Sequence, residues 1–260
     1  MGDDTRNEAP GLRLNKVLAE AGIASRRKAD ELIFSGTVSV DGLVETNPGR
    51  RVDLARERVA VNGVALAAPP AQSLLFMLNK PTGVVTTVRD PQGRPTVLDL
   101  LPEELRRCRL FPVGRLDFFS EGLLLLTTDG DLCHGLTHPS RHLPKVYQVV
   151  LRGEVPEESL DLMRQGMRLA EGEELAPAAV RRLPSQPGKT TLELTLSQGI
   201  NRQIRRMCRD LGLTILTLRR VAQGPLNLGG LKTGAWRPLS AQEEGSLRQA
   251  VGLPPRGGRS

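Results

Sequence analysis

The sequence predicts an α+β protein built from two domains of unequal size. The chain has 260 residues, whereas an average domain has roughly 150. Both helix-like and strand-like patterns occur along it, and residues 64–72, rich in alanine and proline, have the irregular composition of a linker. We therefore expect a disordered leader at residues 1–11, a small domain at 12–63, the linker at 64–72, a larger domain at 73–245 and a tail at 246–260.

The small domain begins with two short helices. Apolar residues recur at three- and four-residue spacing between Leu12 and Ala21, which predicts the first helix. Ser25 is placed to cap the second helix, and Gly36 to end it. Two alternating apolar runs, each closed by a tight-turn dipeptide, follow at residues 38–42 and 59–63. Helices followed by hairpin strands predict a small α+β module.

The larger domain mixes strands and helices. Strands are predicted at Leu74–Asn79, Gly122–Thr128, Val146–Leu151 and Thr191–Leu196, and helices at Pro156–Met167 and Asn201–Leu211. We expect Asp129-Gly130 to be a plain turn after its strand. The domain is therefore expected to be mixed α/β or α+β.

Charge and composition narrow the class of protein. Lysine and arginine number 36 against 29 acidic residues, a net charge of +7 that favours an anionic partner such as nucleic acid. The seven aromatic residues are too few for a protein that binds single strands mainly by base stacking. The strongest recognition signals are therefore expected to be charge and shape.

Other classes of protein are excluded or disfavoured by the sequence. Three widely separated cysteines cannot form a fully paired disulfide framework, which indicates a reducing compartment such as the cytoplasm. The apolar runs are far shorter than the roughly 18 residues of a membrane helix. Residues 1–10 carry three acidic residues and no apolar stretch, so we do not expect a targeting peptide there.

Two basic clusters are candidate phosphate contacts. The first, on the two amino-terminal helices, comprises Arg13, Lys16, Arg26, Arg27 and Lys28, together with the capping Ser25. The second spans residues 199–221, with six arginines and one aspartate. A helix starting near Asn201 would place on one face the residues Arg202, Arg205, Arg206 and Arg209. The alternative for both clusters is an ordinary solvated helix face.

Three kinds of side chain could carry chemistry. Asp117 precedes a nearly unbroken apolar strand, and a carboxylate in such a place needs a cationic partner, for which Arg115 and a later arginine are candidates. Tyr147, the only tyrosine, could stack on a base or transfer a proton. The alternatives are a structural loop aspartate and a tyrosine at the core edge. We predict no metal site, because Pro139 breaks the helix that would align His134, His138 and His142.

Several motifs occur in the order that a known family shows. GRLDFFSEGLLLLTTDG at 114–130 resembles the catalytic signature of the pseudouridine synthases of the RsuA/RluB type. KPTG at 80–83, KVY at 145–147 and GINRQIRRM at 199–207 are similar to the family's other motifs. Residues 12–33 and 38–42 resemble the small RNA-binding domain first recognised in ribosomal small-subunit protein four. The resemblance covers about Leu12 to Leu239.

The resemblance implies a fold, a reaction and roles for single residues. The catalytic domain would have a largely antiparallel sheet and would turn uridine in RNA into pseudouridine without a cofactor. Asp117 would be the essential carboxylate, as nucleophile at the anomeric carbon or as base at the neighbouring ribose carbon. Arg205 would pair with Asp117, and Arg115 would help displace the target base. Tyr147 would stack near the uracil and take part in removing the proton from carbon 5.

The resemblance also implies partners. The ending GPLNLGGLKTGAWRPL favours large-subunit ribosomal RNA, bare or in an assembling particle, over small-subunit RNA, which stays open. Lys80 and Asn201 would join the arginines as RNA contacts, and we expect a cytoplasmic monomer. Ser120 replaces the usual threonine, and the pair Phe118-Phe119 is unusual, which bears on target choice.

Two rival functions remain. One is a non-catalytic RNA-binding protein of ribosome assembly on the same scaffold. The other is a glycosidase or nucleosidase, which usually needs two carboxylates about 5 to 9 Å apart. Glu121 is the only second acid near Asp117 in the sequence, and we expect it to be exposed.

Overall fold

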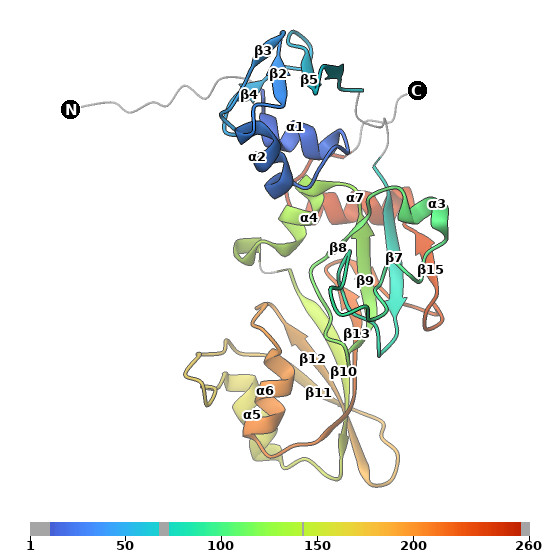
Figure 1. The fold of residues 1–260 in the computed structure, drawn as a ribbon. Coiled ribbons are helices and arrows are strands. Elements are labelled where there is room, and N and C mark those ends of the chain that lie inside the picture. The colour runs from blue at the N-terminus through green and yellow to red at the C-terminus, as the bar shows by residue number, and fades with distance from the viewer. Residues whose placement is uncertain (1–10, 68–72, 142, 256–260) are drawn as a thin grey trace, which may run out of the picture. The chain divides into compact units, whose positions relative to one another are not determined.

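The computed structural model describes residues 11–67, 73–141 and 143–255. The predicted leader up to residue 10, residues 68–72 of the predicted linker, His142 and residues 256–260 of the predicted tail lie outside the described part. The chain falls into two units that divide between Gln72 and Ser73 (Figure 1). None of the helices in the described ranges has the length and apolar character that crossing a membrane requires.

The first unit has two helices and a small sheet. Its elements are β1 (Leu12–Arg13), α1 (Leu14–Glu20), α2 (Arg26–Phe34), β2 (Val38–Val40), β3 (Leu43–Val44), β4 (Arg51–Val52), β5 (Val59–Val61) and β6 (Val64–Ala65). The main sheet has the order β3-β2-β5-β6, while β1 pairs with β4. One face of each helix packs on the sheet through residues such as Leu14, Leu18 and Ile33, all of them fully buried.

Local chemistry explains most of these elements. The Ser25 hydroxyl accepts a hydrogen bond from the Lys28 N–H at 3.3 Å, as predicted for the cap of α2. Asp41 and Asn62 have positive φ angles, as a two-residue hairpin turn requires. The first helix begins two residues later than predicted because Leu12 pairs with Val52, and Val64, placed in the linker by the sequence, pairs with Val61.

The second unit contains a nine-stranded sheet. Its main path runs β11-β12-β10-β13-β9-β7-β15, with β14 paired to β13 and β8 to β9. The strands are β7 (Leu75–Lys80), β8 (Phe111–Val113), β9 (Glu121–Thr127), β10 (Lys145–Arg152), β11 (Ala179–Leu183), β12 (Lys189–Leu196), β13 (Ile215–Gln223), β14 (Leu226–Asn227) and β15 (Trp236–Pro238). Every strand pair is antiparallel except β13 with β9, which confirms a largely antiparallel sheet.

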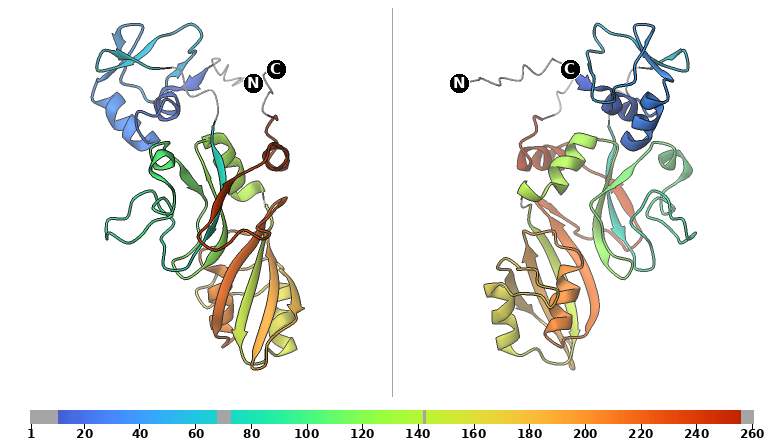
Figure 2. Two further views of the ribbon diagram at one scale, coloured as in Figure 1. Left: turned by 90° about the vertical axis from the view of Figure 1, so that its right-hand side faces the viewer. Right: turned by 60° about the vertical axis from the view of Figure 1, so that its left-hand side comes forward.

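The parallel contact between β13 and β9 joins two halves of this sheet. In one half, α5 (Glu157–Gln165) and α6 (Gln203–Asp210) lie on one face of β10, β12 and β13 (Figure 2) and share a core with them. In the other half, α4 (Gly130–Thr137) and α7 (Ala241–Ala250) pack on one side of β7 and β9, and the segment with α3 (Glu103–Arg106) packs on the other. We therefore look for the active site at the contact between β13 and β9, where the two halves of the sheet meet.

Two sequence predictions for this unit are wrong. Asp129 does not belong to a plain turn but caps α4, accepting a hydrogen bond from the Leu132 N–H at 2.9 Å and pairing with Arg248 at 2.8 Å. The segment from residue 246 is not simply a tail, because α7 continues to Ala250 and both Leu247 and Val251 are buried in the core. The predicted helix break at Pro139 is confirmed, since α4 ends one residue before His138.

Candidate active site

A cavity of about 390 Å³ opens in the second unit where the two halves of the sheet meet. Its walls come from the loop between β8 and β9, from β10 and β13, and from the segment that leads into α6. The polar and aromatic side chains along it are those of Arg115, Asp117, Ser120, Thr137, Lys145, Tyr147, Gln198, Asn201, Arg202, Gln203, Arg205, Arg220 and Gln223. Segments far apart in the sequence thus supply one concave and mainly cationic site.

Asp117 is held by two arginines from the start of α6. Its Oδ2 lies 3.3 Å from Arg205 Nε and 3.3 Å from Arg202 Nη1. The Asp117 side chain is 29% exposed, so it is shielded on one side and open to the cavity on the other. The arrangement presents a paired carboxylate to whatever enters the cavity.

Arg205 also ties the loop that carries Asp117 to α6. Its Nη2 donates to the Phe119 carbonyl at 2.7 Å and to the Ser120 hydroxyl at 3.0 Å. Burial lowers the pKa of Arg205 from its ordinary value, and the charge of Asp117 opposes this shift. Ser120, which departs from the usual threonine, thus keeps the hydroxyl that this contact needs.

Arg202 reaches Asp117 from an unusual backbone conformation. It is the amino-terminal cap residue of α6 and has a φ of 51°, in the left-handed region. A residue other than glycine pays roughly 1–2 kcal/mol for this conformation, which clusters at functional sites. The strain is consistent with a turn that serves to aim the side chain.

Lys80 binds the loop that carries Asp117 from the interior of the protein. It is completely buried, and its Nζ donates to the carbonyls of Pro81, Asp117 and Ser120 at 2.9, 3.1 and 2.9 Å. Burial lowers the pKa of Lys80 to about 8, and the charges of Asp117 and Glu121 oppose this shift. The prediction that Lys80 contacts RNA is therefore wrong, because a fully buried ammonium cannot reach a phosphate.

The remaining residues of the predicted site lie around the cavity. Tyr147 is half-buried on β10, with its ring against the cores of both halves of the sheet. Arg115, Asn201 and Arg202 are exposed and stand among the lining residues. The structure thus brings together all four predicted catalytic residues, including Arg205.

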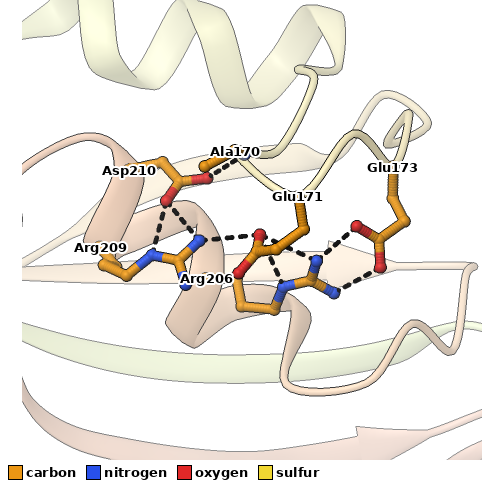
Figure 3. A network of polar contacts seen from close by, with 6 residues as sticks. All are labelled: Ala170, Glu171, Glu173, Arg206, Arg209 and Asp210. Carbon is orange, nitrogen blue, oxygen red and sulfur yellow. Dashed lines mark hydrogen bonds and ion pairs between the residues drawn. The ribbon is translucent and has the colours of Figure 1, made fainter.

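Arg206 and Arg209 are engaged elsewhere, on the side of α6 that faces the loop after α5 (Figure 3). Arg206 donates to Glu171 and Glu173, both at 2.9 Å, and Arg209 Nη1 lies 2.6 Å from Glu171. The two arginines hold the pKa of Glu171 near 2. We call these two arginines, with Glu171, Glu173 and Asp210, the acidic latch. Carboxylates of the chain itself therefore neutralise Arg206 and Arg209. The sequence had predicted that both arginines are free to contact phosphate.

The basic residues of the first unit are mostly exposed. Arg13, Arg26 and Arg27 lie at the surface, whereas Lys28 pairs with Glu31 at 2.7 Å and Lys16 with Glu20 at 3.6 Å. The Ser25 hydroxyl is used to cap α2. The cluster is thus a surface feature in which two cations already have acidic neighbours.

Sequence reasoning gave no role of their own to the cavity residues Lys145, Arg220 and Gln223, although Lys145 stands in the KVY motif and Arg220 in the basic segment 199–221. Arg220 and Gln223 are almost fully buried, at 2% and 1% exposure. Both belong to β13, which the sequence did not predict as a strand. The register in which β13 pairs with β10 places both residues at the cavity, and the sequence alone does not show this register.

Comparison with known proteins agrees with this geometry. Residues 74–210 match the family model described as RNA pseudouridylate synthase, and residues 12–59 match the S4 domain. The ribosomal large subunit pseudouridine synthase B of Bacillus subtilis is 41% identical, over 91% of this chain and 95% of its own. An uncharacterised RNA pseudouridine synthase of Mycobacterium bovis is 43% identical, over 95% and 96% of the two chains.

A solved structure supports the same assignment. A crystal structure of a pseudouridylate synthase is 30% identical, with a TM-score of 0.65, and the match covers 91% of this chain and all of that chain. The order of the two matched domains is the one that the motifs indicate. The chain therefore belongs to the RNA pseudouridylate synthase family, in its RsuA/RluB branch, with an S4 domain ahead of the catalytic domain.

Proposed function

We propose that this chain converts uridine to pseudouridine in large-subunit ribosomal RNA, with Asp117 as the essential carboxylate. The observation that carries the proposal is the pair of arginines on one oxygen of Asp117, which leaves the carboxylate facing a cavity. The large-subunit target is supported by relatives such as those of Bacillus subtilis and Yersinia pestis, both described as ribosomal large subunit pseudouridine synthase B.

The proposed reaction breaks the bond between the ribose C1′ and N1 of uracil, and its electron pair stays with the base. Asp117 attacks C1′ to form an ester, from which it is displaced when C5 bonds to C1′, or it removes the proton at C2′ to leave a glycal and returns that proton when C5 bonds to C1′. The detached uracil turns, its C5 bonds to C1′, C5 loses its proton and N1 gains one. Because the product is an isomer of the substrate, the balance needs no oxidant, reductant or cofactor. We propose that Tyr147 stacks on the base and takes part in the removal of the C5 proton.

The surface of the cavity suits a base that has left its helix. Arg115 and Arg202, exposed beside Asp117, are proposed to occupy the place of the base and to meet the phosphates that flank it. Flipping a base costs a few kcal/mol, which such contacts offset. On the first unit, the exposed Arg13, Arg26 and Arg27 are proposed to contact phosphate, as are Lys16 and Lys28 when RNA displaces their acidic neighbours.

The rival functions are less well supported. A two-carboxylate hydrolase needs a second acid beside Asp117, but Glu121 is not among the residues that line the cavity. A protein that only binds RNA would not need a carboxylate that two arginines hold inside such a cavity. We further propose that the protein acts as a monomer in the cytoplasm.

The target is tested with ribosomal RNA tritiated at C5 of uracil. The enzyme should release tritium from large-subunit RNA, either bare or in partly assembled particles. Release from small-subunit RNA alone would reassign the target, and absence of release from every substrate would favour the binding protein. Sequencing the modified RNA then maps the uridine.

A further inference from the structure

Arg220 is a buried cation that the described part of the chain does not neutralise. Its side chain is 2% exposed, and its Nε donates to the Leu123 carbonyl at 2.8 Å. Nη2 is buried and has no hydrogen-bond partner, and no carboxylate of the described residues forms an ion pair with the guanidinium. A buried ion without a counter-charge is unfavourable, so a site of this kind fits a partner that arrives with the substrate.

The sheet places Arg220 between the two elements of the reaction site. In the register of the strands, Arg220 lies opposite Gly122 on β9 and opposite Tyr147 on β10. Gly122 follows directly on the loop that carries Asp117. Arg220, Tyr147 and Asp117 all line the same cavity, so the guanidinium lies within the walls where the uracil would be bound.

A β-bulge sets the direction of this side chain relative to its neighbours. Tyr147 pairs with Arg220 but Val146 pairs with Ala222, so Val221 is an extra residue on β13. Because side chains alternate along a strand, the extra residue puts Arg220 and Gln223 on one face, together with Tyr147 and Lys145. All four line the cavity. The backbone, rather than a flexible side chain, therefore aims Arg220 into the site.

The charges of the cavity separate its rim from its floor. Five of the charged side chains that line it are cationic and only Asp117 is anionic. Arg202 and Arg205 pair with Asp117, and Arg202 is 49% exposed. Arg115 is also exposed, so these two residues at the rim can reach phosphates. Arg220 is enclosed, and we therefore assign it to the base rather than to the backbone of the RNA.

We propose that Arg220 is a further catalytic residue that stabilises the negative charge on uracil while the base is detached from ribose. The inference deepens the proposed function. When the C1′–N1 bond breaks, its electron pair makes the base an anion, with charge spread over N1 and the two carbonyl oxygens. The guanidinium donates to one of these oxygens. Bonding of C5 to C1′ removes the charge again, and the proton then lost from C5 is matched by the proton that N1 gains, so the step balances without a co-reactant.

A preorganised donor to a developing anion typically contributes about 10²- to 10³-fold in kcat. Arg220→Gln should therefore lower the rate of tritium release under single-turnover conditions by this factor. Arg181→Gln is the control, because Arg181 is a strand arginine of the same unit, on β11, and is not among the cavity residues. It should keep the wild-type rate.

Binding and stability distinguish this role from two others. Arg220→Gln should bind RNA with unchanged affinity and unchanged salt dependence, whereas a phosphate contact would make the slope shallower. Its melting temperature should equal or exceed that of the wild type, because an unpaired buried charge has been removed. If Arg220→Gln melts at a lower temperature than the wild type, and Arg220→Lys loses as much rate as Arg220→Gln, the role of Arg220 is structural and the proposal is overturned.

A better leaving group should rescue the variant. Once the target uridine is mapped, a short RNA with 5-fluorouridine at that position carries a base whose anion fluorine already stabilises. Its consumption, followed by mass spectrometry of the digested RNA, should be slowed by Arg220→Gln several-fold less than that of uridine. Equal slowing of both bases would contradict the inference. Lack of turnover of the matching uridine RNA by the wild type would instead refute the proposed function.

Discussion

Gly122 is the position where one added methyl group should separate the two halves of the catalytic sheet. It has a φ of 104°, and a Cβ built there would lie 2.2 Å from the Arg220 carbonyl oxygen and 2.8 Å from the Arg220 nitrogen. Ordinary van der Waals contact begins at 3.4 Å, so the strands would have to move apart by about 1.2 Å. Neighbouring strands are about 4.8 Å apart, and such a shift takes a hydrogen bond out of range.

The consequence for stability can be estimated from the register. In the backbone register, β9 pairs with β13 at two positions, Glu121 with Arg219 and Gly122 with Arg220. The left-handed conformation adds roughly 1–2 kcal/mol for a residue with a Cβ. Together with the lost pairing, we expect Gly122→Ala to cost about 4 kcal/mol or more, which is in the range of the most damaging substitutions.

Urea unfolding measures this cost. With a slope of at most about 3 kcal/mol/M, the midpoint should fall by about 1.3 M or more, and activity should be lost with it. The control is Gly230→Ala, where the added Cβ meets nothing within 4 Å. A change below about 1 kcal/mol in Gly122→Ala would refute the reasoning, since β9 and β13 would then tolerate the separation.

Three further predictions follow. Asp129→Ala removes the cap of α4 and the carboxylate that lies 2.8 Å from Arg248, so the free energy of unfolding should drop by about 2–4 kcal/mol. Asp131→Ala, on the same helix, is the control. Small and equal losses of stability in both variants would argue against the cap. The pKa of Lys80 is about 8 in the folded protein and near 10.5 in the unfolded chain, so between these pH values the unfolded state binds one more proton. The free energy of unfolding should therefore rise by up to about 3 kcal/mol from pH 8 to 10.5. An identical pH profile in Lys80→Met would contradict this. Replacing Glu171 and Glu173 by Gln frees Arg206, whereas Arg209 keeps its ion pair with Asp210, so RNA binding should become more salt-dependent by a slope of about 0.7–0.9. An unchanged slope, as expected for the control Glu158→Gln, would mean that Arg206 does not meet phosphate.

Local patterns predicted those parts of the fold that depend on neighbouring residues. The cap at Ser25 and the turns at Asp41 and Asn62 depend on the chemistry of a few consecutive residues, and the apolar run of β9 depends on burial alone. Strand β13 was missed because two arginines interrupt its apolar pattern, although one of them, Arg220, is buried. Helix α7 was missed because Leu247 is its only fully buried residue.

The candidate site was predicted where motifs carry it and not where distant partners decide it. The resemblance placed Asp117 and Arg205 together, and the structure pairs them. It gave no information on whether Lys80 points outward or into the protein. The sequence placed Arg206 and Arg209 on one helix face with Arg205, but both turn to the loop after α5, where Glu171, more than thirty residues away, pairs with them. Such long-range partners leave no periodic signal in the sequence.

The most direct test of the central claim compares Asp117→Asn with Asp161→Asn. Both substitutions neutralise an aspartate paired with arginine, but Asp161 lies on the surface of α5, away from the cavity. With ribosomal RNA tritiated at C5 of uracil, the wild type and Asp161→Asn should release tritium at the same rate. Asp117→Asn should release none while still binding the RNA. Release by Asp117→Asn at the wild-type rate would contradict the assignment of Asp117 as the catalytic carboxylate.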